Sequence, residues 1–278
     1  MKTNQIEKIT DEEYFKIKAV SASQIKQYDK GPYWFWKSSP FNPEKEPEAD
    51  SNALVFGKLC HCLLLEPDMF EKEYIIVDFG KLRSTKKYEE AKKENPGKII
   101  INQEEYEHAQ KMVQEVKNHR LASAILNGAT AEMPFIWTDE ATGLKCKAKL
   151  DAIKRTKNGL VVIDYKTSSD IEGVLNWPQK LQYPIQAEFY SKAVEIKYGE
   201  KPVEFVFIIQ SNKAGEEDIV CVANVEYDTQ QAALSIMEHH MSEIKNKLEQ
   251  WETTKDKQIF AAYPNRMEMR YSNWFMER

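Results

Sequence analysis

The apolar residues of this chain follow two periods, one typical of helices and the other typical of strands. Helical spacing covers residues 24–28, 51–65 and 104–126, and later 181–198 and 229–252. Ser21 or Ser23 is suited to cap the first of these helices, and Pro184 marks the first turn of the fourth. β-Branched and aromatic residues gather in 131–138, 144–154, 160–167, 203–210 and 219–227, which predicts five strands. This order predicts an α/β fold with a mixed central β-sheet flanked by helices.

In two stretches the apolar residues follow neither the helical nor the strand spacing. Residues 31–50 are rich in proline, aromatic and charged residues and predict an irregular connection, and the lysine-rich stretch 79–98 predicts a mobile loop or insertion. The expected organisation is an N-terminal extension at 1–20, a single domain at 21–255 and a C-terminal tail at 256–278. The aromatic and basic end of that tail, residues 263–278, is suited either to a subunit contact or to packing back on the domain.

The composition narrows the class of protein. The 278 residues are 42% hydrophobic, enough for a substantial core, yet no apolar run reaches the roughly 18 residues of a membrane span. The first ten residues are charged and do not resemble a secretory signal. The cysteines at 60, 62, 146 and 221 form neither a CxxC zinc pair nor a regular disulfide framework. We therefore expect a soluble cytoplasmic protein with reduced thiols.

The net charge of −5 argues mildly against a nucleic-acid partner, but it hides local basic stretches. Lysine and arginine concentrate in residues 81–87, 145–149 and 154–157. Such runs are commonly solvated faces, although here they flank the candidate site described next and could form a phosphate track. Charge alone does not separate the two interpretations.

Asn158-Gly159 lies between two predicted strands and is a strong signal for a two-residue hairpin turn. Such a turn would place Asp151 opposite Lys166, with Asp164 on the same face of the hairpin. A bulge would break this parity. Two carboxylates at the end of an apolar hairpin repel each other, and Mg²⁺ or Mn²⁺ would relieve the repulsion. A structural Asp–Lys ion pair on a solvated sheet face fits the same pattern, and the spacing leaves both interpretations open.

At these residues the sequence resembles the PD-(D/E)xK nuclease superfamily. Asp151 stands for the first motif, with Leu150 in place of its proline, and Asp164-Tyr165-Lys166 stands for the (D/E)xK motif. The segment 57–70 is similar to the histidine-bearing helix of RecE-type (exonuclease VIII-like) phage exonucleases, which implies that His61 is a metal ligand. On its own, a histidine in an apolar helix is more often a core residue.

Three further segments support the resemblance, which runs from about residue 20 to at least 230. Glu132 resembles the acidic residue that opens the first strand of the sheet in RecB-like and RecE-like nucleases, although a solvated glutamate there is as common. Gln186 and Tyr190 match a Gln-x-x-x-Tyr element, and Gln182 and Tyr183 lie one helical turn earlier. In these families such residues orient the catalytic lysine or contact DNA. The segment 21–26 looks like the start of the family's domain.

The resemblance implies a restriction-endonuclease-like core with an N-terminal helical extension. It also implies Mg²⁺, with Mn²⁺ as a substitute, on His61, Asp151, Asp164 and the Tyr165 backbone carbonyl, with Glu132 as a further ligand. Lys166 would act on the nucleophile or the phosphate. Lys147 and Lys149, with Gln182 and Tyr183, are candidate DNA contacts.

For function, the resemblance implies a 5′→3′ exonuclease on double-stranded DNA ends in phage-type recombination, a single-strand annealing partner, and a ring-shaped trimer or tetramer. The chain has no GxxxxGK[ST] loop, so it carries no P-loop motor motif. Three alternatives remain: a repair-type single-strand or structure-specific nuclease, a non-cleaving DNA-binding protein, and a scaffold whose Asp–Lys cluster is structural.

Overall fold

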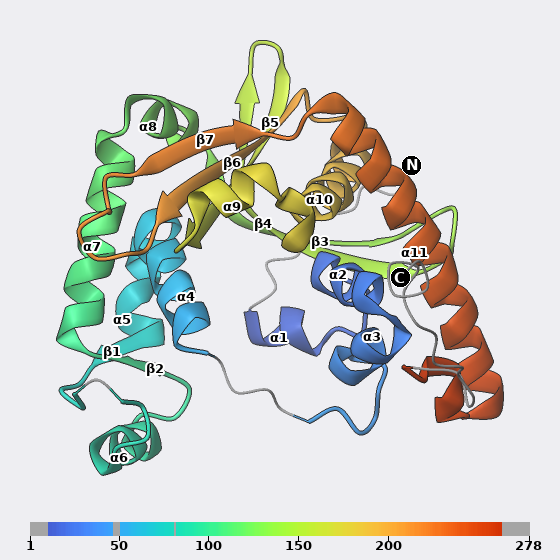
Figure 1. The fold of residues 1–278 in the computed structure, drawn as a ribbon, viewed down its shortest axis with the longest axis horizontal. Helices are drawn as coiled ribbons and strands as arrows, with labels where there is room; N and C mark the ends of the chain where they lie inside the picture. The colour runs from blue at the N-terminus through green and yellow to red at the C-terminus, as the bar shows by residue number, and fades with distance from the viewer. Residues whose placement is uncertain (1–10, 47–50, 81, 263–278) are drawn as a thin grey trace, which may run out of the picture.

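A five-stranded mixed sheet forms the centre of the molecule (Figure 1). The computed structural model describes residues 11–46, 51–80 and 82–262. The strands lie in the order β3 (Thr130–Thr138), β4 (Lys145–Thr156), β5 (Gly159–Ser168), β6 (Glu204–Ser211) and β7 (Val220–Asn224). Strands β5 and β6 are parallel and the other neighbours are antiparallel. This arrangement confirms the predicted fold class.

Helices cover both faces of the sheet. On one face lie α2 (Ala22–Lys30), α10 (Tyr183–Tyr198) and α11 (Tyr227–Thr254), and on the other lie α4 (Asn52–Leu65), α7 (Gln103–Asn118) and α8 (Arg120–Leu126). The shorter helices are α1 (Asp11–Lys16), α3 (Pro32–Ser38), α5 (Phe70–Glu73), α6 (Lys86–Glu94) and α9 (Ile171–Asn176), with 3₁₀ turns at Pro67–Met69, Pro178–Lys180 and Lys257–Phe260. No helix in these described ranges is both long and apolar enough to cross a membrane.

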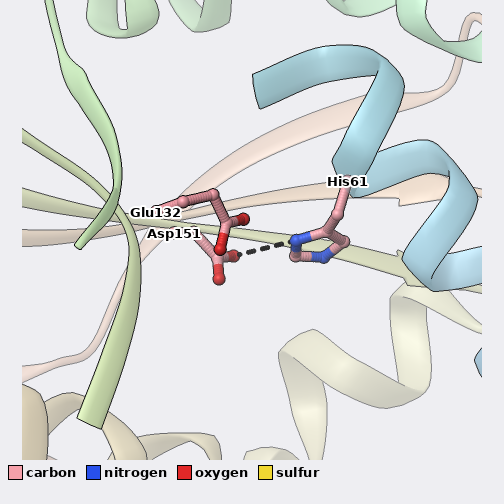
Figure 2. Close-up of side chains that lie close together, drawn as sticks. All are labelled: His61, Glu132 and Asp151. Carbon is pink, nitrogen blue, oxygen red and sulfur yellow. Dashed lines mark ion pairs between the residues drawn. The ribbon is translucent and has the colours of Figure 1, made fainter. Parts of the chain in front are cut away.

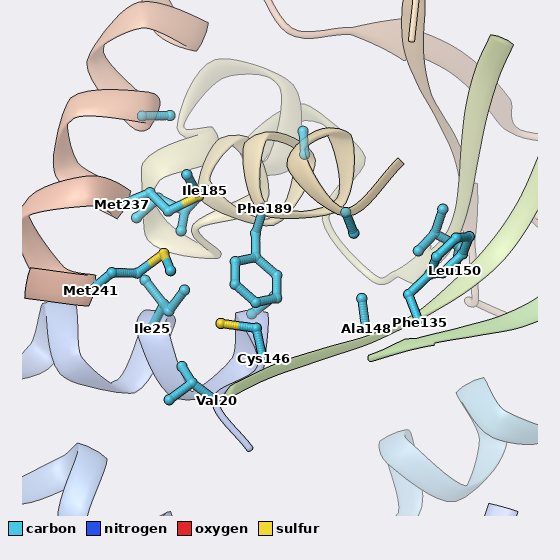
Figure 3. Close-up of a cluster of buried hydrophobic side chains, with 14 of the residues drawn as sticks. Val20, Ile25, Phe135, Cys146, Ala148, Leu150, Ile185, Phe189, Met237 and Met241 are labelled. Carbon is cyan, nitrogen blue, oxygen red and sulfur yellow. The ribbon is translucent and has the colours of Figure 1, made fainter. Parts of the chain in front are cut away.

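The larger core lies between the sheet and the layer of α2, α10 and α11. Figure 3 shows Phe189 of α10 pointing between Cys146 of β4 and Met241 of α11, with Ile25 of α2 beside them. Burying side chains of this size stabilises the fold by about 1.5–3 kcal/mol each. This packing fixes α2 and α10 against β4 and β5, which is where the candidate site lies.

Each of the two stretches without a clear period contains a helix, α3 or α6, so the absence of regular structure was wrongly predicted for these two segments, whereas residues 39–46 are irregular as expected. Pro32 occupies the first turn of α3, where its missing N–H costs nothing, and Trp36 stacks on Phe260 with ring centroids 4.2 Å apart. In the second stretch, Ala91 of α6 packs with Phe79 and Ile100 in a small core of its own. Polar surface helices and single buried residues leave little periodic signal.

Other boundaries also differ from the prediction. The predicted helix at 104–126 is two helices, because His119 ends α7 and its Nδ1 accepts a hydrogen bond from the Ala122 backbone to cap α8. A parallel pair of three-residue strands, β1 (Tyr74–Ile76) and β2 (Ile99–Ile101), was not predicted. Residues 263–278, the proposed contact segment of the tail, lie outside the described residues.

The β4–β5 hairpin turns one residue earlier than predicted. Thr156 pairs with Gly159, so the loop residues are Lys157 and Asn158. Gly159 instead opens β5 with φ at 134°, and a Cβ there would lie 2.6 Å from a methyl carbon of Val203. The cross-strand register therefore shifts by two residues, and a shift of two keeps the side chains of the paired residues, 152–156 and 159–163, on their predicted faces.

Candidate active site

Strands β4 and β5 separate beyond the pair formed by Ala152 and Ile163. Beyond this pair the strands no longer exchange backbone hydrogen bonds. Instead, the Asp151 carboxylate accepts a hydrogen bond of 2.8 Å from the Tyr165 backbone N–H. The split thus places Asp151 beside the segment Asp164–Lys166 rather than directly across from Lys166. Asp151 also interacts electrostatically with Asp164, so the two predicted carboxylates do lie together.

The neighbouring strand β3 is distorted at the same level. The β3–β4 ladder skips Glu132 and Asp151, and Glu132 has a left-handed φ of 50°, which is uncommon for a residue with a side chain. Leu150 and Ile153 both pack into the core under α10, whereas Ala152 packs on the opposite side. The strand alternation is therefore interrupted at Asp151, and this turns Asp151 and Glu132 toward a common point.

His61 completes a compact group with these two carboxylates (Figure 2). One ligand atom from each of His61, Glu132 and Asp151 lies within 4.8 Å of the others, and His61 Nδ1 is 3.5 Å from Asp151 Oδ2. Helix α4 presents His61 because Leu59, Cys60 and Cys62 are buried against the sheet. One imidazole and two carboxylates form a donor set that fits a divalent cation such as Mn²⁺ or Mg²⁺.

Asp164 lies next to this group and is held by two partners. Its side chain is fully buried; Lys166 Nζ forms an ion pair with Oδ2, and Gln186 Nε2 donates a hydrogen bond of 2.7 Å to Oδ1. Lys26 of α2, which was not predicted, donates a hydrogen bond of 2.8 Å to Gln186 Oε1. Helices therefore approach the site from both faces of the sheet: α4 brings His61 to Asp151, and α10, supported by α2, brings Gln186 to Asp164.

The remaining predicted residues, at the start of α10 and along it, contact Lys166, Gln186 or α2. The Tyr183 ring centre is 5.5 Å from Lys166 Nζ, a cation–π contact, and Tyr190 forms a side-chain hydrogen bond with Gln186. Gln182 takes a left-handed φ of 53° at the start of α10, and its amide donates to Asp29 of α2. Gln182 thus ties the start of α10 to α2.

Burial and mutual repulsion change the protonation of the site. Burial, reinforced by the charge of Asp164, raises the pKa of Asp151 to about 7. Burial and the Lys166 charge lower the pKa of His61 to about 4, and burial raises the pKa of Glu132. Burial alone would lower the pKa of Lys166, but the carboxylates of Asp164 and Asp151 outweigh it and raise that pKa above its usual range. At neutral pH this leaves His61 as a neutral donor and Lys166 as a cation.

The two lysines of β4 that were predicted to contact DNA have different surroundings. Lys149 Nζ lies 2.9 Å from Glu132 Oε2, at the edge of the candidate metal group. Lys147 is buried, and its Nζ donates hydrogen bonds of 2.9 Å to each of the Tyr14 and Ile17 carbonyls near the end of α1. Because these carbonyls occupy its ammonium, we do not propose Lys147 as a DNA contact.

Replacing Lys147 by methionine is expected to destabilise the protein by about 1–3 kcal/mol, since it leaves buried carbonyls without a donor. DNA binding is expected to stay within about two-fold of wild type. Thermal unfolding and a DNA titration of the variant, beside Lys145→Met on the same strand but exposed, provide the comparison. Weaker DNA binding at unchanged stability would show instead that Lys147 reaches the substrate.

Metal binding is expected to weaken as the pH falls, because a cation must displace the proton of Asp151. With the pKa of Asp151 near 7, apparent Mn²⁺ affinity should fall about tenfold between pH 8 and pH 6. Titration calorimetry in two buffers of different ionisation enthalpy measures both the affinity and the protons released. An affinity that is independent of pH over this range would contradict the assignment of Asp151 as a ligand.

The chain belongs to a family that shares this architecture. Residues 21–269 match the family described as PDDEXK-like domain of unknown function (DUF3799). Membership supports the PD-(D/E)xK superfamily of the predicted resemblance, and it does not distinguish the RecE-type group within it. No curated protein matches the sequence.

One solved structure shares the fold of this chain. A crystal structure of a provisionally assigned exonuclease from Eubacterium rectale is similar over 86% of this chain and 87% of its own, with 19% identity and a TM-score of 0.56. The structure named SSO0001 covers 66% of this chain and 84% of its own, with 18% identity and a TM-score of 0.31. The first similarity shows a shared fold, and the second is too weak to carry an argument.

Proposed function

We propose that this protein is a divalent-metal-dependent nuclease that hydrolyses DNA phosphodiesters at the split between β4 and β5. The observation that carries this proposal is the convergence of His61, Glu132 and Asp151 beside the buried Asp164–Lys166 pair. Membership of a PDDEXK-like family supports it. A purely structural ion pair between Asp164 and Lys166 would not require His61, Glu132 and Asp151 to lie together beside it, nor the left-handed backbone of Glu132.

Each side chain has a proposed role. His61, Glu132 and Asp151 would hold the cation, which we propose is Mg²⁺ with Mn²⁺ as a substitute, and which when bound supplies a Lewis acid and lowers the pKa of water. Asp164 and the Tyr165 carbonyl are proposed as further ligands. The support for Asp164 as a ligand is its electrostatic interaction with Asp151. The support for Tyr165 is the hydrogen bond between its backbone and His61.

Lys166 is proposed to donate to the scissile phosphate as a cation. Its raised pKa makes it a poor base at neutral pH, and its position beside Asp164 directs the ammonium to the edge of the metal group. Gln186 orients Asp164, and Tyr190 contacts Gln186. Lys149, Gln182 and Tyr183 are the proposed DNA-facing residues around the site.

We further propose a cytoplasmic 5′→3′ exonuclease on double-stranded ends, acting in phage-type recombination with an annealing partner and as a ring-shaped homo-oligomer. The support is the similarity of the α4 histidine segment to RecE-type enzymes. Linear duplexes labelled at the 5′ or the 3′ end, with Mg²⁺, test the polarity. Early release of 3′ label would contradict it, and cleavage of closed circles or flaps would favour the repair-type alternative.

Metal-dependent cleavage of DNA is the activity on which the polarity and the partners depend. Incubation of linear duplex DNA with the purified protein is expected to yield acid-soluble nucleotides with Mg²⁺ or Mn²⁺ and none with chelator. Binding of DNA without any cleavage in either metal would favour the non-cleaving alternative.

A further inference from the structure

Lys26 is the one basic residue of α2 that reaches the candidate site among the contacts of the described residues. It lies 160 positions before Gln186 in the sequence, yet its Nζ donates a hydrogen bond of 2.8 Å to Gln186 Oε1. Ile25 and Tyr28 are buried in the core on either side of it and hold α2 against α10 and α11. The packing of these two neighbours therefore determines where Lys26 lies.

The hydrogen bond determines which end of the Gln186 amide faces the site. A glutamine amide has an accepting oxygen and a donating NH₂ group, and the two ends exchange when the amide rotates. With Lys26 on the oxygen, Nε2 points at Asp164 Oδ1 over 2.7 Å. If the amide rotated, its oxygen would meet the Asp164 carboxylate, and two acceptors would face each other in a buried site.

Tyr183 restrains Lys26 from a second direction. The ring centre of Tyr183 lies 5.3 Å from Lys26 Nζ and 5.5 Å from Lys166 Nζ, so one aromatic ring contacts the amino groups of both lysines. The Lys166 ammonium pairs with Asp164 Oδ2, while the Gln186 amide occupies Oδ1. Both oxygens of Asp164 are thus oriented, one directly by Lys166 and the other indirectly by Lys26.

We propose that Lys26 is a positioning residue that sets the orientation of Asp164 through the Gln186 amide. This inference rests on the proposed nuclease function for its effect on catalysis, and on the hydrogen-bond chain for its effect on structure. Lys26 itself touches neither the metal group nor, in this role, the DNA. Its loss should therefore lower the rate of the chemical step and leave substrate affinity nearly unchanged.

The kinetic test uses Lys26→Met, which keeps the length of the side chain and removes the donor. Single-turnover cleavage should slow by roughly tenfold or more, with KM for DNA within about two-fold of wild type. Lys26→Arg, which keeps a donor, should recover part of the rate. The matched control is Lys30→Met, an exposed lysine on the same helix, which should cleave like wild type.

A double-mutant cycle separates positioning from direct contact with DNA. In a Gln186→Leu background, Lys26→Met should slow cleavage by less than about two-fold further, because the link that it acts through is already missing. An equal rate loss in both backgrounds, or a loss confined to KM, would overturn the proposal, because Lys26 would then act independently of Gln186.

A structural measurement tests the same link without relying on activity. The side-chain amide signals of Gln186, assigned by their absence from the Gln186→Leu spectrum, should shift in Lys26→Met and stay in place in Lys30→Met. Unchanged Gln186 signals in folded Lys26→Met protein would overturn the proposal. If the wild-type protein cleaves no DNA under any metal condition, the proposed function fails, while this spectrum still decides the role of Lys26.

Discussion

Replacing Asp151 by asparagine is expected to lower metal-dependent DNA cleavage by about a thousandfold or more while making the metal-free protein more stable. The activity falls because a charged ligand is lost. The stability rises because folding holds Asp151 at a pKa of about 7 against an ordinary value of 3.8, which penalises the folded state as the pH rises through about 7. Asparagine removes this penalty and can still accept the Tyr165 hydrogen bond.

The stability gain should therefore depend on pH. It is expected to reach about 1 kcal/mol or more at pH 8 and to shrink toward pH 5, where Asp151 of the wild type is protonated. Thermal unfolding in chelator at both pH values, with cleavage assays in parallel, measures the two effects. Asp78→Asn, at a carboxylate 93% exposed, is the control and should change neither. A variant that loses stability and keeps its activity would indicate a structural Asp151.

Replacing Lys166 by methionine should have the opposite effect on stability. Cleavage is expected to fall by about a hundredfold or more because the phosphate loses a cationic donor. The free energy of unfolding is also expected to fall by about 3–5 kcal/mol, because the fully buried Asp164 carboxylate would lose its partner charge. Chemical denaturation and single-turnover cleavage measure the two losses.

A second substitution separates these two losses. Adding Asp164→Asn to Lys166→Met removes the unpaired charge, so most of the lost stability should return while the cleavage remains absent. Recovery of both would show that Lys166 serves only to neutralise Asp164. Recovery of neither would show that the pair stabilises the fold by packing rather than by charge.

The hairpin shows how far the sequence could predict the site. Side-chain alternation predicted that Asp151, Asp164 and Lys166 share one face of the hairpin. The structure does bring Asp151 beside Asp164, but it does so where the alternation is interrupted at Asp151. An error of two in the register is harmless to alternation, since side chains repeat every second residue. The prediction that Asp151 lies opposite Lys166 was wrong, because β4 and β5 are no longer paired beyond Ala152 and Ile163.

What the sequence could not predict depends on contacts between distant segments. Lys26 meets Gln186 across 160 positions, and no local pattern records such a contact. The left-handed backbone of Glu132 is unfavourable for its residue type, so it arises from the surrounding sheet rather than from local preference. Lys147 follows the strand alternation, but its ammonium is directed by α1, whose position is set by tertiary packing.

We propose that His61, Glu132 and Asp151 hold a divalent cation beside Asp164 and Lys166. Diffraction from crystals soaked in Mn²⁺, recorded at a wavelength where manganese scatters anomalously, tests it most directly. We expect one strong anomalous peak within coordination distance of His61 and Asp151, with Glu132 among the neighbours. The absence of a peak there, or a peak only at other carboxylates of a protein that still cleaves DNA, would contradict it.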